Sequence, residues 1–98
     1  MGRPVVSENL VVARNDDLMS ARVGSEVVML HLERNAYYDL DAIGAVIWER
    51  LATPSSVGPL IDSLVEQYAV DRETCARDVL AFLAEALTEG VIRIVEAE

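Results

Sequence analysis

Few residues of this 98-residue sequence could take part in covalent or acid–base chemistry, and those few are isolated. His31 is the sole histidine and Cys75 the sole cysteine, so a zinc site, which needs three or four such ligands, is not predicted. We interpret His31 as a solvated residue on the polar face of a strand, and Cys75 as packing on the apolar face of a helix. The glycines are too scattered for a phosphate-binding loop, and no pair of acids has surroundings that would raise a pKa. The sequence predicts a protein that is not an enzyme and needs no metal or other cofactor.

The charge balance argues against further classes of partner. Seventeen aspartates and glutamates against eight arginines give a formal net charge of −9, and an acidic surface opposes binding to phosphate backbones. No apolar run approaches the roughly 20 residues of a membrane span. The N-terminus lacks the basic-then-apolar pattern of a signal peptide. We therefore expect a cytoplasmic protein without a nucleic-acid or membrane partner.

The hydrophobic pattern predicts one α+β domain over residues 10–95, between a flexible arm at 1–9 and an acidic tail at 96–98. Apolar residues first alternate at the two-residue spacing of strands and then recur every three or four residues, as on helices. Strands are expected at 10–14, 18–23, 26–33 and 36–40, with a last short strand at 91–95. Helices are expected at about 42–51, from 57 onward, and from 72 to about 89, with Asp41, Ser56 and Asp71 as caps.

Short turns at 24–25 and 34–35 predict that the three strands from 18 to 40 form an antiparallel meander. The strand 36–40 is then an exposed edge with unpaired backbone N–H and C=O groups. Alternation places Tyr38 and Leu40 toward the core and Tyr37 outward, which makes Tyr37 the better candidate for contact with a ligand. On strand 26–33, one face carries Val28, Leu30 and Leu32, and the opposite, polar face carries His31.

The first and third predicted helices, at about 42–51 and from 72 to about 89, differ in how much apolar surface they present. The first is expected to pack Ile43, Gly44, Ile47, Trp48 and Leu51 on one face. The third has an apolar stripe of roughly 160°, against about 100° for a helix that only faces a core. The stripe consists of Cys75, Val79, Phe82, Leu83 and Ala86, extended on one side by Ala76, Leu80 and Leu87. Either the helix is deeply buried, or one edge of the stripe is vacant for a partner.

Three motifs in this order resemble the PqqD-like family, over about residues 18–95. They are Tyr37-Tyr38-x-Leu40-x-x-x-Gly44-Ala45-x-Ile47-Trp48, then Tyr68-x-Val70-Asp71, then Cys75-x-x-Asp78-Val79-x-x-Phe82-Leu83 followed by Gly90-Val91-Ile92. The resemblance implies a winged helix-turn-helix fold, with a three-stranded antiparallel sheet followed by three helices. Ala86, where the family usually has a larger residue, and the acidic tail depart from the pattern.

Members of that family act as recognition elements for ribosomally synthesised and post-translationally modified peptides (RiPPs). The resemblance implies that a leader segment pairs as an added antiparallel strand on the third strand and is gripped by the third helix. The peptide-binding residues would be Ala36, Tyr37, Tyr38, Asp39 and Leu40 on the strand and Arg77, Leu80, Leu83, Ala84 and Leu87 on the helix. An exposed edge with apolar pockets beside it independently suits the binding of an extended peptide.

The implied partners are a precursor peptide and a maturation enzyme to which the leader is delivered. Resemblance favours lasso-peptide biosynthesis, in which the enzyme is a leader peptidase of the transglutaminase-like type and the leader carries a tyrosine, a proline and a leucine. The alternatives are a chaperone for a radical SAM enzyme, as in PQQ synthesis, a winged-helix DNA-binding regulator, and a structural or toxin-neutralising partner. The regulator is disfavoured because the third helix and wing offer only Arg72, Arg77 and Arg93. A homodimer through the exposed strand edge is also expected to be possible.

Overall fold

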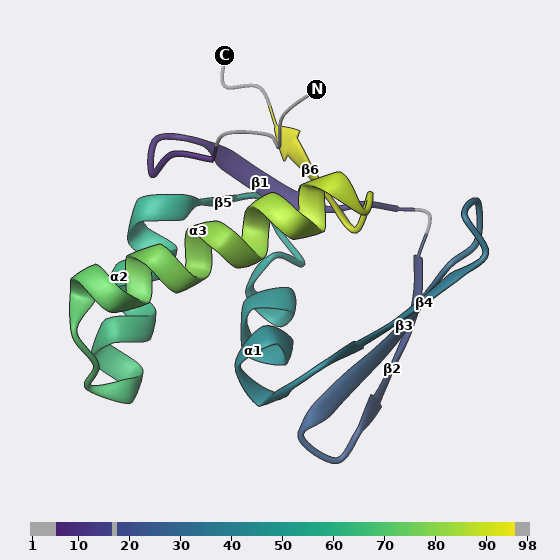
Figure 1. Ribbon diagram of the computed structural model, residues 1–98, viewed down its shortest axis with the longest axis horizontal. Helices are drawn as coiled ribbons and strands as arrows, with labels where there is room; N and C mark the ends of the chain where they lie inside the picture. Colours follow the sequence, from purple (N-terminus) through teal and green to yellow (C-terminus); the bar gives the residue numbers. More distant parts are fainter. Residues whose placement is uncertain (1–5, 17, 96–98) are drawn as a thin grey trace.

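Two small antiparallel sheets and three helices make up residues 6–16 and 18–95, which the computed structural model describes (Figure 1). The mixed α+β class, with antiparallel strands followed by three helices, is confirmed. Within those residues, every helix is too short or too polar to span a lipid bilayer. The elements are β1 (Val11–Arg14), β2 (Leu18–Val23), β3 (Glu26–His31), β4 (Ala36–Leu40), α1 (Ala42–Arg50), β5 (Ser55–Ser56), α2 (Val57–Tyr68), α3 (Arg72–Thr88) and β6 (Ile92–Val95).

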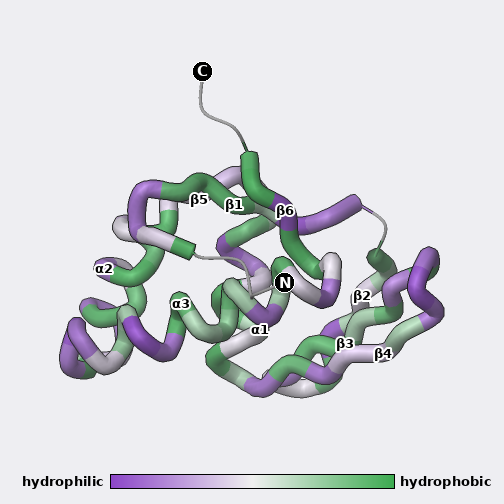
Figure 2. The backbone as a smooth tube through the Cα atoms, turned by 45° about the horizontal axis from the view of Figure 1, so that its top comes forward, coloured by the Kyte–Doolittle hydropathy of each residue, from purple (hydrophilic) through white to green (hydrophobic). Residues whose placement is uncertain are grey.

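The meander is confirmed, with strand order β2-β3-β4 and β4 at an edge. Gly24 (φ 63°) and Asn35 (φ 53°) take the left-handed conformation at the two hairpin turns, which glycine and asparagine adopt most readily. In Figure 2 the middle of β3 is hydrophobic, and hydrophilic residues gather in the turn between β3 and β4. Short-range pattern and turn chemistry were therefore sufficient to predict this sheet.

The buried face of the meander is the opposite of the expected one. His31 is only 3% exposed, and Val27 and Met29 are buried on the same face, whereas Leu30 and Leu32 (57% exposed) lie outside. The prediction of a solvated His31 was wrong. Both faces of β3 carry apolar residues, so alternation alone could not tell which face α1 would cover, and α1 packs on the Val27 face.

Two smaller corrections concern the ends of the same elements. The strand ends at His31 rather than at residue 33, because the residues from Leu32 to Asn35 form the turn to β4. Ile43, expected on the core face of the first helix, is 45% exposed. The expected core residue Trp48 is buried, and the Arg14 guanidinium lies 4.4 Å from its ring centroid.

A second sheet, which the sequence did not predict, joins distant segments of the chain. β1 lies in its centre and pairs antiparallel with β5 and with β6, for example Val12 with Ser55 and with Ile94. Such pairings between strands more than forty residues apart leave no local signal. Together with the helices, this sheet encloses a core whose largest fully buried members include Ile47, Leu51, Ile61, Leu64 and Leu83.

A flexible arm was expected at residues 1–9, and the structure describes residues 6–9 of it. Glu8 accepts hydrogen bonds from Arg72 at 2.7 and 3.2 Å, its backbone oxygen accepts one from the Gly58 N–H at 3.0 Å, and Val6 packs against the core. The arginine lowers the pKa of the Glu8 carboxyl. Residues 6–9 therefore lie on the body of the domain. Residues 1–5 and the acidic tail at 96–98 lie outside the described residues.

All three predicted residues occupy the N-cap positions of their helices, and two of them bond with their side chains. Asp41 accepts a hydrogen bond from the Gly44 N–H at 2.9 Å, and Asp71 accepts one from the Thr74 N–H at 2.9 Å, which lowers the pKa of Asp71. Ser56 occupies the cap of α2, but its side chain makes no capping hydrogen bond. The cap at Asp41 lets β4 run into α1 with one intervening residue.

Gly44 is expected to tolerate no branched side chain. A Cβ there would lie 3.3 Å from the Asp41 Oδ1, 3.3 Å from the Leu40 Cβ and 3.4 Å from the Phe82 Cε1. Gly44→Val should lower the free energy of unfolding by about 1–3 kcal/mol through overpacking, measured by urea denaturation. Ala42→Val, at an exposed position of the same helix, is the control for helix propensity, and an equal loss there would contradict the packing argument.

Candidate functional site

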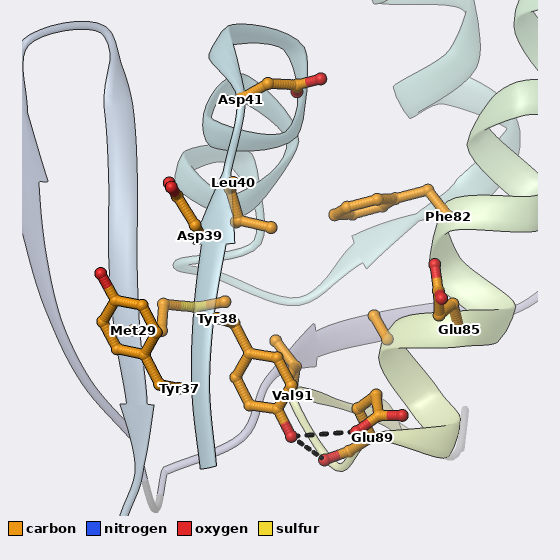
Figure 3. Close-up of a pocket in the computed structure, with 11 residues that line it drawn as sticks. Met29, Tyr37, Tyr38, Asp39, Leu40, Asp41, Phe82, Glu85, Glu89 and Val91 are labelled. Carbon is orange, nitrogen blue, oxygen red and sulfur yellow. Dashed lines mark hydrogen bonds between the residues drawn. The ribbon is translucent and has the colours of Figure 1, made fainter.

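A groove of about 530 Å³ lies between the free edge of β4 and the helix α3 (Figure 3). Its floor is apolar, made by the buried residues Met29, Ala86 and Val91. The other lining residues are Tyr37, Tyr38, Asp39, Leu40 and Asp41 from β4 and the start of α1, and Phe82, Glu85 and Glu89 from α3 and its end. The groove therefore combines an open strand edge with an apolar floor.

The strand register determines which backbone groups of β4 face the groove. Val23 and Glu26 flank a two-residue turn and lie opposite one another. Such a pair exchanges backbone hydrogen bonds, so the backbone groups of Glu26, and of every second residue after it along β3, bond to β2. The intervening residues of β3 bond to Ala36, Tyr38 and Leu40. The N–H and C=O groups of Tyr37 and Asp39 then point to the free edge, where no described backbone group outside the sheet pairs with them.

The side chains of β4 alternate about this edge. Tyr38 and Leu40 point toward α3, whereas Tyr37 and Asp39 lie on the outer face of the sheet (Figure 3). Tyr37 is 67% exposed, and Tyr38 and Leu40 pack partly against the core. Ala36 lies half-buried at the start of the strand, opposite His31. All five strand residues predicted as peptide-binding are thus together along one edge.

The end of α3 is tied to the sheet at one end of the groove. The Tyr38 hydroxyl lies 3.1 Å from the Glu89 Oε1 and 3.3 Å from the Glu89 backbone oxygen, and it donates to these acceptors. Burial, and then the hydrogen bond to Glu89, raises the pKa of Tyr38. Beside it, Arg34 donates to the Thr88 backbone oxygen at 3.2 Å. A Cβ on Gly90 (φ 78°) would lie only 3.0 Å from the His31 Nε2, so this junction requires a glycine.

The α3 residues that face the groove are not those predicted. Phe82, Glu85, Ala86 and Glu89 follow one another at helical spacing on the groove side. Of the predicted residues, Leu83 is fully buried (0% exposed), Leu80, Ala84 and Leu87 are half-buried, Arg77 is exposed, and none lines the groove. Phe82 and Ala86 belong to the apolar stripe that the sequence analysis singled out. The sequence could not show which edge of that stripe faces β4. Nothing in the sequence pattern distinguished Glu85 and Glu89 from other polar surface residues, so their place in the groove could not be predicted.

The described residues offer little to a reaction or to a phosphate backbone. Burial, and then the charge of Asp78, raises the pKa of the Cys75 thiol, which makes it less reactive. Within those residues, no group of three or more histidine, cysteine or acidic side chains could hold a metal ion. On α3, Arg72 is held by Glu8 and by Asp62 at 2.8 Å, so its charge is already compensated. The open strand edge beside the apolar floor is a geometry suited to binding an extended chain.

Comparison with known proteins agrees with this geometry. Residues 26–92 match the family described as "Coenzyme PQQ synthesis protein D (PqqD)". A solved structure described as "TbiB1 in Complex with the TbiA(beta) Leader Peptide" is similar, with a TM-score of 0.78 and 32% sequence identity, covering 88% of this chain and 99% of that chain. The comparison with curated protein sequences gave no match.

The hydroxyl of Tyr38 is expected to stabilise the groove. Tyr38→Phe removes the hydrogen bonds to Glu89 and should lower the free energy of unfolding by about 0.5–1.5 kcal/mol, measured by urea denaturation. Tyr37→Phe is the matched control, because the Tyr37 hydroxyl makes no hydrogen bond to a described residue. Equal effects of the two substitutions would show that the contact with Glu89 does not hold α3 in place.

Proposed function

The chain belongs to the PqqD family, and from this premise we propose that it binds the leader segment of a ribosomally made precursor peptide and delivers it to a maturation enzyme. The observation that carries the proposal is the unpaired edge of β4 beside an apolar-floored groove. The likeness to a protein solved with its leader peptide, at 32% identity over nearly the whole of both chains, supports the same function.

In the proposed complex the leader adds an antiparallel strand to β4. Backbone hydrogen bonds to Tyr37 and Asp39 give register and part of the affinity, independently of the leader's sequence. Alternate side chains of the added strand enter the groove against Tyr38, Leu40 and Phe82. The others lie on the outer face beside Tyr37, which is how that exposed ring contacts the ligand. Selectivity then comes from the fit of the inward side chains to the floor.

The protein's own part in the pathway is binding, not catalysis. We propose that it presents the leader so that a separate enzyme acts on the remainder of the precursor. A lasso-peptide leader peptidase is the favoured enzyme, on the likeness to the leader-peptide complex. A radical SAM enzyme is the alternative suggested by the family's description in PQQ synthesis. DNA binding has no supporting observation, because Arg72 is compensated and the net charge is −9.

Proline scanning of β4 tests strand addition. Proline has no N–H to donate, so Tyr37→Pro and Asp39→Pro should each weaken binding at least tenfold while the domain stays folded, since these N–H groups face the free edge. The probe is a fluorescent synthetic leader of the precursor peptide encoded beside this gene, titrated by anisotropy. Tyr38→Pro is the contrasting variant, because it breaks the ladder to β3 and should unfold the sheet, seen by circular dichroism.

Two outcomes would oppose the proposal. Unchanged affinity in both edge variants would mean that strand addition does not occur at β4. No micromolar binding of any such leader by the wild-type protein, together with retention on duplex DNA at low salt, would overturn leader recognition itself.

Substitutions on α3 test which of its faces contacts the leader. Phe82→Glu puts a charge on the groove side and should weaken leader binding more than tenfold. Leu80→Glu and Leu87→Glu put the same charge on the other flank of the stripe, where our sequence analysis expected the contact. Anisotropy gives the affinity of each variant and urea denaturation gives its stability. Stronger loss of binding in Leu80→Glu or Leu87→Glu, at equal stability, would assign the contact to that flank instead.

A further inference from the structure

The groove is acidic as well as apolar. Four of its eleven lining residues are acidic and none is basic. Asp41 is occupied as the cap of α1, and Glu89 accepts the Tyr38 hydroxyl. The Asp39 side chain lies on the outer face of the sheet (Figure 3). Glu85 and Asp39 are both exposed, and neither carboxylate makes a hydrogen bond or ion pair with any described residue. Glu85, unlike Asp39, stands on the α3 side of the groove.

Glu85 is placed where an added strand would pass. It projects from the α3 wall one helical turn from both Phe82 and Glu89. Arg34, on the turn before β4, donates to the Thr88 backbone oxygen and makes no ion pair with Glu85 among the described residues. It therefore does not compensate Glu85. A bound strand would bring its side chains into a negative field between β4 and α3, where an acidic residue is repelled and a cation is attracted.

We infer that the leader segment recognised by this protein carries an arginine or lysine that pairs with the Glu85 carboxylate. This inference rests on the proposed function and specifies its ligand: an extended peptide with apolar side chains for the floor and one basic side chain for the α3 wall. The long aliphatic stem of arginine or lysine suits this position, because it can lie along Phe82 while the charged end reaches Glu85.

The experiment compares Glu85→Gln with Glu66→Gln, which removes the same charge from an exposed position of α2 outside the groove. The probe is the fluorescent leader encoded beside this gene, with each arginine and lysine replaced singly by glutamine. For wild type and Glu66→Gln, one replacement should weaken binding about three- to tenfold, the range of a partly exposed ion pair. In Glu85→Gln, that same replacement should change binding less than twofold. Glu85→Arg should in turn favour a leader with glutamate at that position.

The outcomes separate the two proposals. If the wild-type protein binds no leader, the proposed function fails. If it binds the leader but every replacement has the same effect in wild type and in Glu85→Gln, only the pairing with Glu85 is overturned. Tight binding of a leader whose bound segment has no basic residue would overturn it as well.

Discussion

The separation of α3 from β4 is the constraint on which the site depends. Two aromatic contacts set it: the Tyr38 hydroxyl bonds to Glu89 at the end of the helix, and the Phe82 ring lies over Gly44 at the start of α1. Between these contacts the helix neither covers the strand edge nor pairs with it. Because both contacts come from bulky side chains, they act as spacers as well as attachments, and the groove remains between them.

The arrangement also explains why glycines stand at both ends of the groove. Gly44 lets Leu40, Asp41 and Phe82 converge, and Gly90 lets the chain leave α3 in a left-handed conformation against His31. In each case a Cβ would lie within 3.4 Å of a neighbouring side chain. The binding surface is therefore tied to the packing of the core, and substitutions at these glycines should alter both.

An open strand edge carries a risk of pairing with another copy. Here the edge is bordered by Asp39 and Glu85 in a chain of net charge −9, so two copies would bring like charges together. The same acids would favour a basic segment in the ligand. Under the proposed function, the same electrostatic feature would oppose self-association and contribute to the choice of peptide.

The meander, the edge position of β4, the helices and their cap residues could be predicted from the sequence, because these depend on local alternation, turn residues and capping side chains. The sequence also led to the PqqD-like family through motifs that are mostly scaffold, such as Gly44, Ile47 and Trp48. The five strand residues of the candidate site could be named because an edge is a consequence of strand order.

Which faces of the elements are buried could not be predicted in this way, because burial depends on how the elements pack. Both faces of β3 carry apolar residues, so the burial of His31 followed from the side on which the rest of the domain packs, with Gly90 against its ring. The stripe on α3 is apolar across its whole width, so the choice of Phe82 and Ala86 over Leu80 and Leu87 as groove residues depended on where β4 lies. The pairing of β1 with β5 and β6, and the acidic wall at Glu85, likewise arise from segments far apart in the chain. Local pattern carries no record of such contacts, because they are set by how whole elements pack.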